Sequence, residues 1–69
     1  MELKEILNLI KENINIGLCY VGDNGYSLTD KNTILENEDL LSKKVKSLNL
    51  KTFLNENSTK TYLIIKLYR

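Results

Sequence analysis

The sequence predicts an α+β domain in which an N-terminal amphipathic helix packs on a small antiparallel β-sheet that ends in a C-terminal hairpin. Three observations support this prediction. Apolar residues recur with helical spacing near the N-terminus, a β-prone run then ends at a strong turn signal, and a long alternating strand closes the chain. With 69 residues, the chain is expected to form one domain over residues 1–69, too small for a large ligand cavity.

The first element is an amphipathic helix over residues 2–13. Its apolar residues fall at positions i, i+3, i+4, i+7 and i+11, within a stripe about 80° wide. These residues are Leu3, Ile6, Leu7, Ile10 and Ile14. Glu2 and Glu5 stand in the first turn, where the positive end of the helix dipole favours carboxylates. The stripe is expected to face the core.

Two strands joined by a turn are expected next. Residues 16–21 are β-prone, and the Gly-Asp-Asn-Gly sequence at 22–25 indicates a turn because Asn and Gly tolerate positive φ angles. Residues 26–29 return as a second strand. Residues 33–35 are a candidate for a short third strand.

Residues 38–48 allow two interpretations. An Asn37 cap followed by apolar residues at helical spacing would make a second helix. The alternative is a long hairpin after one helical turn near 38–42, with alternating residues at 48–54 paired to 61–68 across a polar loop at 55–60. We favour the hairpin because the strand at 61–68 needs a partner of similar length nearby. The sequence alone leaves the choice open.

The expected hairpin has an outward face with an unusual composition. If Leu54 opposes Thr61, then Phe53 opposes Tyr62. The residues on that face are Lys51, Phe53, Tyr62, Ile64, Lys66 and Tyr68. Four of these six residues are apolar or aromatic, so we expect the face to be covered by the segment at 22–41 or to bind a partner or a second copy.

The net charge of +1 hides a split between the two halves of the chain. Residues 1–39 hold eight carboxylates and three lysines, whereas residues 40–69 hold seven cations and one carboxylate. The carboxylates of the middle segment form a candidate partner-binding surface: Asp23, Asp30, Glu36, Glu38 and Asp39. Carboxylates on turns can take the place of phosphates opposite a basic groove, and they steer association.

Several classes of chemistry find no support in the sequence. The chain has no histidine, so Ser–His and Cys–His catalysis and His-ligated metal sites are excluded. Its glycines do not match a phosphate-binding loop, and the acidic residues near Asp30 lack the glycine of a calcium loop. We expect no catalytic residue, no metal and no cofactor. The single cysteine, Cys19, is expected to be a small buried hydrophobe in a reducing compartment.

The order of elements resembles that of small phage and prophage accessory proteins. It runs from a helix ending in Ile10-Lys11-Glu12-Asn13 through a strand at 17–21 and the Gly22-Asp23-Asn24-Gly25 turn to a closing hairpin. In size and layout it is most similar to anti-CRISPR proteins. The resemblance spans the whole chain without a diagnostic motif, so no site residue is transferred from it. It implies a protein that works by binding and obstruction.

Three hypotheses follow. The first is a non-enzymatic inhibitor in the cytoplasm of a bacterial host, which binds a nucleic-acid-binding defence protein such as a CRISPR effector. The second is direct nucleic-acid binding by the basic hairpin, ranked lower because the chain has one arginine and no RNA-binding motif. The third is a self-assembling structural subunit. No membrane-length segment is present, and a monomer or a homodimer is expected.

Overall fold

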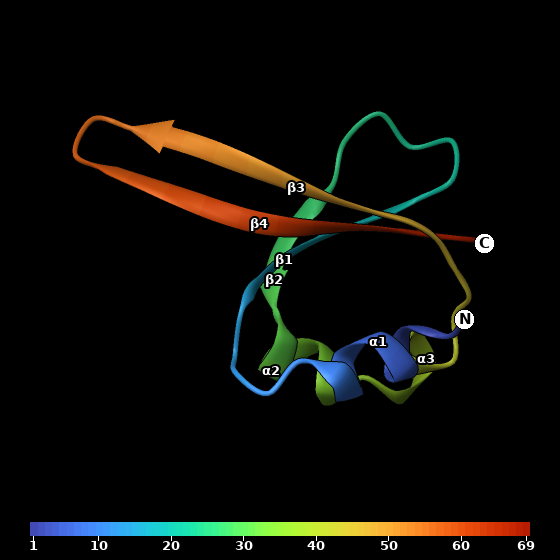
Figure 1. Ribbon diagram of the computed structural model, residues 1–69. Coiled ribbons are helices and arrows are strands. Elements are labelled where there is room, and N and C mark those ends of the chain that lie inside the picture. Colours follow the sequence, from blue (N-terminus) through green and yellow to red (C-terminus); the bar gives the residue numbers. More distant parts are fainter.

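The computed structural model describes residues 1–69 apart from the side chain of Asn55. In chain order the elements are α1 (Leu3–Leu9), β1 (Asn15–Tyr20), β2 (Ser27–Asp30), α2 (Lys31–Leu35), α3 (Glu38–Leu41), β3 (Val45–Asn55) and β4 (Ser58–Leu67). The three short helices form a layer against one face of a four-stranded sheet (Figure 1). No helix in the described part of the chain combines the length and the hydrophobicity that crossing a membrane would need.

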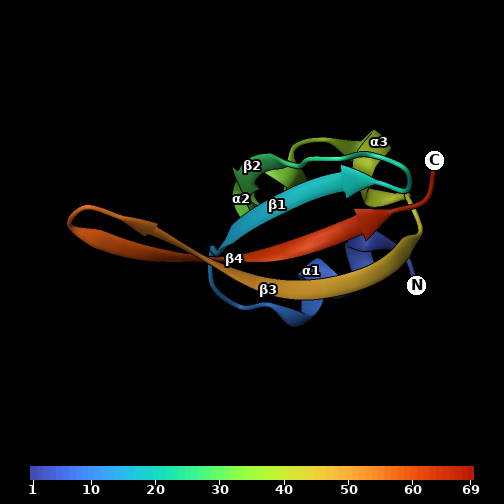
Figure 2. The same ribbon diagram turned by 90° about the horizontal axis from the view of Figure 1, so that it is seen from above.

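The sheet consists of two hairpins joined side by side, in the order β2-β1-β4-β3. The pairs β1–β2 and β3–β4 are antiparallel, whereas the central strands β1 and β4 are parallel (Figure 2). The predicted α+β class, the N-terminal helix and the C-terminal hairpin are therefore confirmed. The sheet is mixed instead of wholly antiparallel, because α2 and α3 connect the two hairpins and β4 returns alongside β1 in the same direction.

The core lies between the helical layer and the central strands. Its fully buried members are Leu3, Leu7, Ile16, Ile34, Ile65 and Leu67. The sequence pattern predicts six buried residues on the helix and the central strands: Ile6, Leu7, Ile10, Leu18, Leu63 and Ile65. Of these, Ile6, Leu7 and Ile65 are buried. The other three, Ile10, Leu18 and Leu63, are partly buried and pack against the core. The helical stripe of the sequence therefore faces the sheet, as predicted.

Helix α1 is shorter than the predicted helix over 2–13, because residues after Leu9 are hydrogen-bonded to Lys31 of α2 instead of continuing the helix. Ile10 already has an extended backbone, with φ −97° and ψ 117°. The Lys31 ammonium donates to the carbonyl of Ile10, and the Lys31 N–H donates to the carbonyl of Ile14 at 3.0 Å. These long-range bonds satisfy carbonyls that further helical turns would have used.

The candidate strand at 33–35 is wrong, because these residues belong to α2. Asp30 caps this helix, and its carboxylate accepts a hydrogen bond from the Thr33 N–H at 2.8 Å. An aspartate at the N-cap position starts a helix by satisfying a free backbone donor. The cap therefore outweighs the β-propensity of Thr33 and Ile34.

Residues 38–48 follow the hairpin interpretation. Helix α3 is a single turn that begins after an Asn37 cap, and β3 starts at Val45. The predicted register is wrong by two residues: Leu54 pairs with Thr59 and Phe53 with Lys60. The reason is that the pairing continues to Asn55 and Ser58, so the turn contains two residues instead of the predicted six. A shift of two leaves every side chain on its predicted face.

The hairpin extends well beyond the helical layer (Figure 1). The seven residues of α1 span about 10 Å at the rise of a helix. The eleven residues of β3 span about 36 Å at the rise of a strand. Strand β4 pairs with β1 only from Leu63 onward, so residues 51–62 form a two-stranded arm.

Candidate functional site

The face of the sheet that points away from the helices, here called the open face, collects most of the predicted hairpin-face residues. The pairing places on it the bare backbone of Gly17 and the side chains of Cys19, Leu28, Ser47, Asn49, Lys51, Phe53, Lys60, Tyr62, Ile64 and Lys66. Tyr26, just before β2, joins them through ring contacts. All four strands therefore contribute to the open face.

Three aromatic rings pack together on the open face. The Tyr26 and Phe53 ring centroids are 6.0 Å apart at an interplanar angle of 63°, and those of Phe53 and Tyr62 are 5.4 Å apart at 85°. These are edge-to-face arrangements, which the ring quadrupoles favour. The Lys51 ammonium lies 5.5 Å from the Tyr26 centroid and 5.8 Å from that of Phe53. Cation–π attraction thus holds a positive charge against the aromatic cluster.

Beside the aromatic cluster, the loop between β1 and β2 borders a shallow hollow of about 250 Å³. The buried Cys19 and the partly buried Ile64 contribute apolar surface to it. Its polar side chains are two amides, one hydroxyl, one ammonium and one carboxylate that is paired with Arg69: Asn24, Asn49, Ser47, Lys66 and Asp23. The hollow can therefore offer apolar contact, hydrogen bonds and a positive charge to one ligand.

Tyr68 is separate from this arrangement. It follows the last residue of β4, and its N–H donates to the carbonyl of Lys44. Its side chain lines a different hollow, together with Asp39, Ser42 and Lys43. Of the six predicted hairpin-face residues, the structure therefore brings together five and leaves Tyr68 at the far end of the strand.

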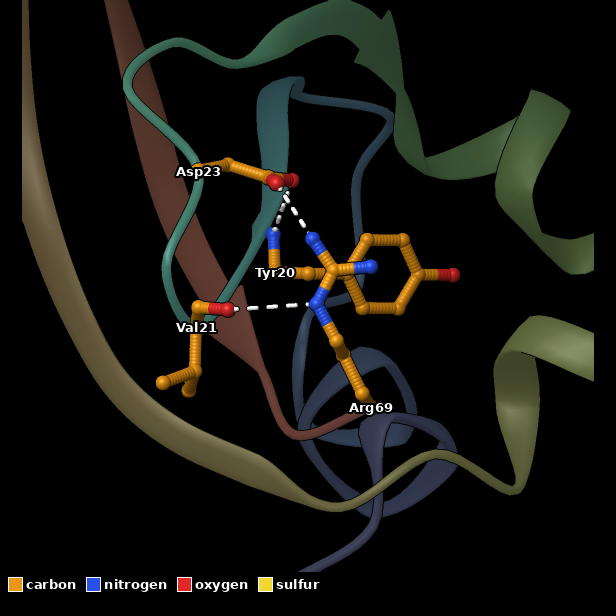
Figure 3. A network of polar contacts seen from close by, with 4 residues as sticks. All are labelled: Tyr20, Val21, Asp23 and Arg69. Carbon is orange, nitrogen blue, oxygen red and sulfur yellow. Dashed lines mark hydrogen bonds and ion pairs between the residues drawn. The ribbon is translucent and has the colours of Figure 1, made fainter.

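Two of the five predicted acidic residues have structural roles. Asp23 accepts a hydrogen bond from the Tyr20 N–H at 3.0 Å and forms an ion pair with Arg69 at 2.6 Å (Figure 3). Arg69 also donates to the carbonyl of Val21 at 3.3 Å, which fastens the C-terminus to the β1–β2 loop. Asp30 caps α2. Hydrogen bonds from the Thr33 hydroxyl and N–H lower the pKa of Asp30 below its ordinary value of 3.8.

The other three acidic residues form an exposed group at the junction of α2 and α3. Glu36, Glu38 and Asp39 line one shallow hollow there, and we call them the acidic corner. Among the described side chains the one ion pair is that of Asp23 with Arg69, so the acidic corner is not neutralised by a neighbouring cation. It lies on the helical side of the sheet, opposite the open face.

A row of exposed leucines on β3 was not predicted as a site. Leu48, Leu50 and Leu54 are 49%, 70% and 81% exposed. The pairing of Leu48 with Ile65 and of Leu50 with Leu63 places this leucine row on the helical side of the sheet. The alternating pattern predicts that these leucines lie on the helical side of the sheet, but the short helices do not reach far enough to cover the leucine row. The exposure of the leucines could have been predicted from the difference in length between the helical and strand segments.

Among the described residues no group of three cysteine or carboxylate side chains comes together in a way that could hold a metal ion. No protein-family model matches the chain, and no curated protein or solved structure was found to be similar to it.

Proposed function

We propose that this protein is a non-enzymatic inhibitor that binds and blocks a host nucleic-acid-binding defence protein, as anti-CRISPR proteins do. The proposed site of action is the cytoplasm of a bacterial host cell. The observation that carries the proposal is the exposed leucine row on the hairpin, on the same side of the sheet as the acidic corner.

The leucine row provides the binding energy in this proposal. Burial of one exposed leucine side chain is worth about 1.5–3 kcal/mol, so Leu50 and Leu54 together could stabilise a complex substantially. Their position on a projecting hairpin lets them enter a groove of a partner without rearrangement of the core (Figure 1). Contiguous exposed apolar surface is typical of protein interaction sites.

The acidic corner provides the selectivity. A protein that binds DNA or RNA presents a basic groove, and the carboxylates of Glu36, Glu38 and Asp39 would face its lysines and arginines. Because these carboxylates are solvent-exposed, their main effect is on the association rate, and salt weakens it. Apolar contact from the leucine row and charge from the acidic corner would then exclude the nucleic acid from its groove.

The test uses purified CRISPR effectors of several types, each assayed for cleavage of target DNA and for complex formation by gel filtration. The wild-type protein should inhibit and co-elute with at least one effector. The double variant Leu50→Ser, Leu54→Ser should lose both properties. Leu28→Ser is the matched control, because Leu28 is 54% exposed on the open face.

Charge reversal separates the two contributions. Glu36→Lys combined with Glu38→Lys should slow association about tenfold at low salt and have little effect on dissociation. If no effector is bound or inhibited, or if the leucine double variant inhibits as well as the wild type, the proposal is wrong.

A further inference from the structure

We infer that the open face binds single-stranded nucleic acid. This inference goes beyond the proposed function, since it concerns the opposite side of the sheet and needs neither the leucine row nor the acidic corner. It depends on the charge of the open face, on its aromatic cluster and on the adjacent hollow.

The charge of the open face favours an anionic ligand. Three lysines stand on its strands: Lys51 on β3, and Lys60 and Lys66 on β4. The two carboxylates at its margin are already engaged, Asp23 with Arg69 and Asp30 as the cap of α2. The strands of the hairpin therefore present lysines on this face, and the one carboxylate of residues 45–67 is Glu56 in the hairpin turn. This charge suits a chain of phosphates.

The aromatic cluster favours bases over other anionic ligands. Tyr26, Phe53 and Tyr62 are each only partly buried, and they come from three different segments. Bases that are not paired stack on such rings irrespective of sequence. The Lys51 ammonium beside two of these rings would lie close to the phosphate of a stacked nucleotide. Aromatic rings interleaved with lysines on a sheet are a typical platform for single strands.

The hollow next to the cluster fits the polar edge of a base. Asn24, Ser47 and Asn49 provide donors and acceptors, and Lys66 adds a positive charge. The Asp23 carboxylate also lines the hollow, but it is paired with Arg69. Tyr26 lines the hollow and also belongs to the cluster, so the two parts are continuous. A single strand could run from the hollow along the arm, with bases towards the rings and phosphates towards the lysines. A duplex hides its base faces, so it would gain less binding energy from stacking on the aromatic rings.

The test is fluorescence anisotropy with a labelled oligothymidine of about 15 nucleotides and a duplex of the same length. The single strand should bind at least about tenfold more tightly than the duplex. Lys51→Gln and Lys66→Gln should each reduce the slope of log affinity against log salt by about 0.7. Lys11→Gln, on the exposed segment after α1, is the matched control and should leave the slope unchanged.

Stacking is tested by comparing two tyrosines. Tyr62→Ser should weaken single-strand binding about tenfold. Tyr62→Phe should preserve binding, and Tyr68→Ser, outside the cluster, should leave it unchanged. A thermal melt of each variant by circular dichroism checks that the fold is intact, and Lys51→Gln provides an independent test if Tyr62→Ser does not fold.

Three results would overturn the inference. One is the absence of single-strand binding at low salt, and another is equal loss of affinity in the site and control variants. The third is binding of an acidic polypeptide, polyglutamate, as tight as that of oligothymidine and equally sensitive to Tyr62→Ser. That last result would assign the open face to a protein partner.

Discussion

The δ1 methyl carbon of Ile64 lies 2.6 Å from the position that a Cβ atom on Gly17 would occupy. A Tyr26 ring carbon lies 3.3 Å from the same point. Side chains of β4 and of the β1–β2 loop therefore pack onto the bare backbone of β1. The missing side chain of Gly17 leaves room for this close approach, which joins the hollow and the aromatic cluster into one surface.

Gly17→Ala should destabilise the protein by about 1–3 kcal/mol, because Ile64 or Tyr26 must move to admit the methyl group. The reduced freedom of the unfolded chain would offset only about 0.4–1 kcal/mol of this. Urea unfolding followed by circular dichroism measures the difference. Gly25→Ala is the control, since no heavy atom lies within 4 Å of the added Cβ. Equal stability of the two variants would contradict the packing described for the open face.

Ile65→Ala and Leu54→Ala should differ sharply although both lie on the helical side of the hairpin. Ile65 is fully buried, so its truncation should cost about 2–5 kcal/mol and unfold much of so small a domain. Leu54 is 81% exposed, and its truncation should change stability by less than about 0.5 kcal/mol. The thermal melts of the two variants provide the measurement. A large loss for Leu54→Ala would show that the arm is covered in solution.

The parts of the fold that depend on local chemistry could be predicted from the sequence. The apolar stripe of α1, the Gly-Asp-Asn-Gly turn, the Asn37 cap and the alternation along β3 each act through neighbours in the chain. Five of the six predicted hairpin-face residues lie on one face for the same reason, because alternation fixes the side of a strand even when the register is wrong by two.

The features that depend on contacts distant in sequence could not be predicted. The early end of α1 depends on Lys31, about twenty residues away, and the parallel pairing of β1 with β4 depends on the path through α2 and α3. The engagement of Asp23 depends on Arg69 at the other end of the chain. For this reason the charge pattern of the sequence predicts a single acidic surface that includes Asp23 and Asp30. In the structure these two carboxylates are engaged elsewhere, and only the acidic corner remains.

The Asp30 cap should make stability depend on pH in the acidic range. The pKa of Asp30 lies below 3.8 in the folded protein, mainly because of the hydrogen bond from the Thr33 hydroxyl. The ionised cap therefore stabilises the fold fully at pH values above the pKa of Asp30 in the unfolded chain. This stabilisation is lost as the pH falls through the lower pKa of Asp30 in the folded protein. Thr33→Val should raise this pKa towards 3.8 and make the loss of stability below about pH 4 shallower. An NMR titration of the Asp30 carboxyl carbon tests this, with Thr52→Val, a β3 variant away from the cap, as the control.

The Phe53–Tyr62 contact should make a measurable contribution to stability even though both rings are partly exposed. Their centroids are 5.4 Å apart at 85°, so a double-mutant cycle of Phe53→Ala and Tyr62→Ala should give a coupling of about 0.5–1.5 kcal/mol. The same cycle with Tyr68→Ala in place of Tyr62→Ala should give a coupling near zero, since Tyr68 lies outside the aromatic cluster. Urea unfolding of the four proteins in each cycle provides the values. A coupling near zero for Phe53 and Tyr62 would mean that the rings do not pack in the free protein, and the aromatic cluster would then have to form when the ligand binds.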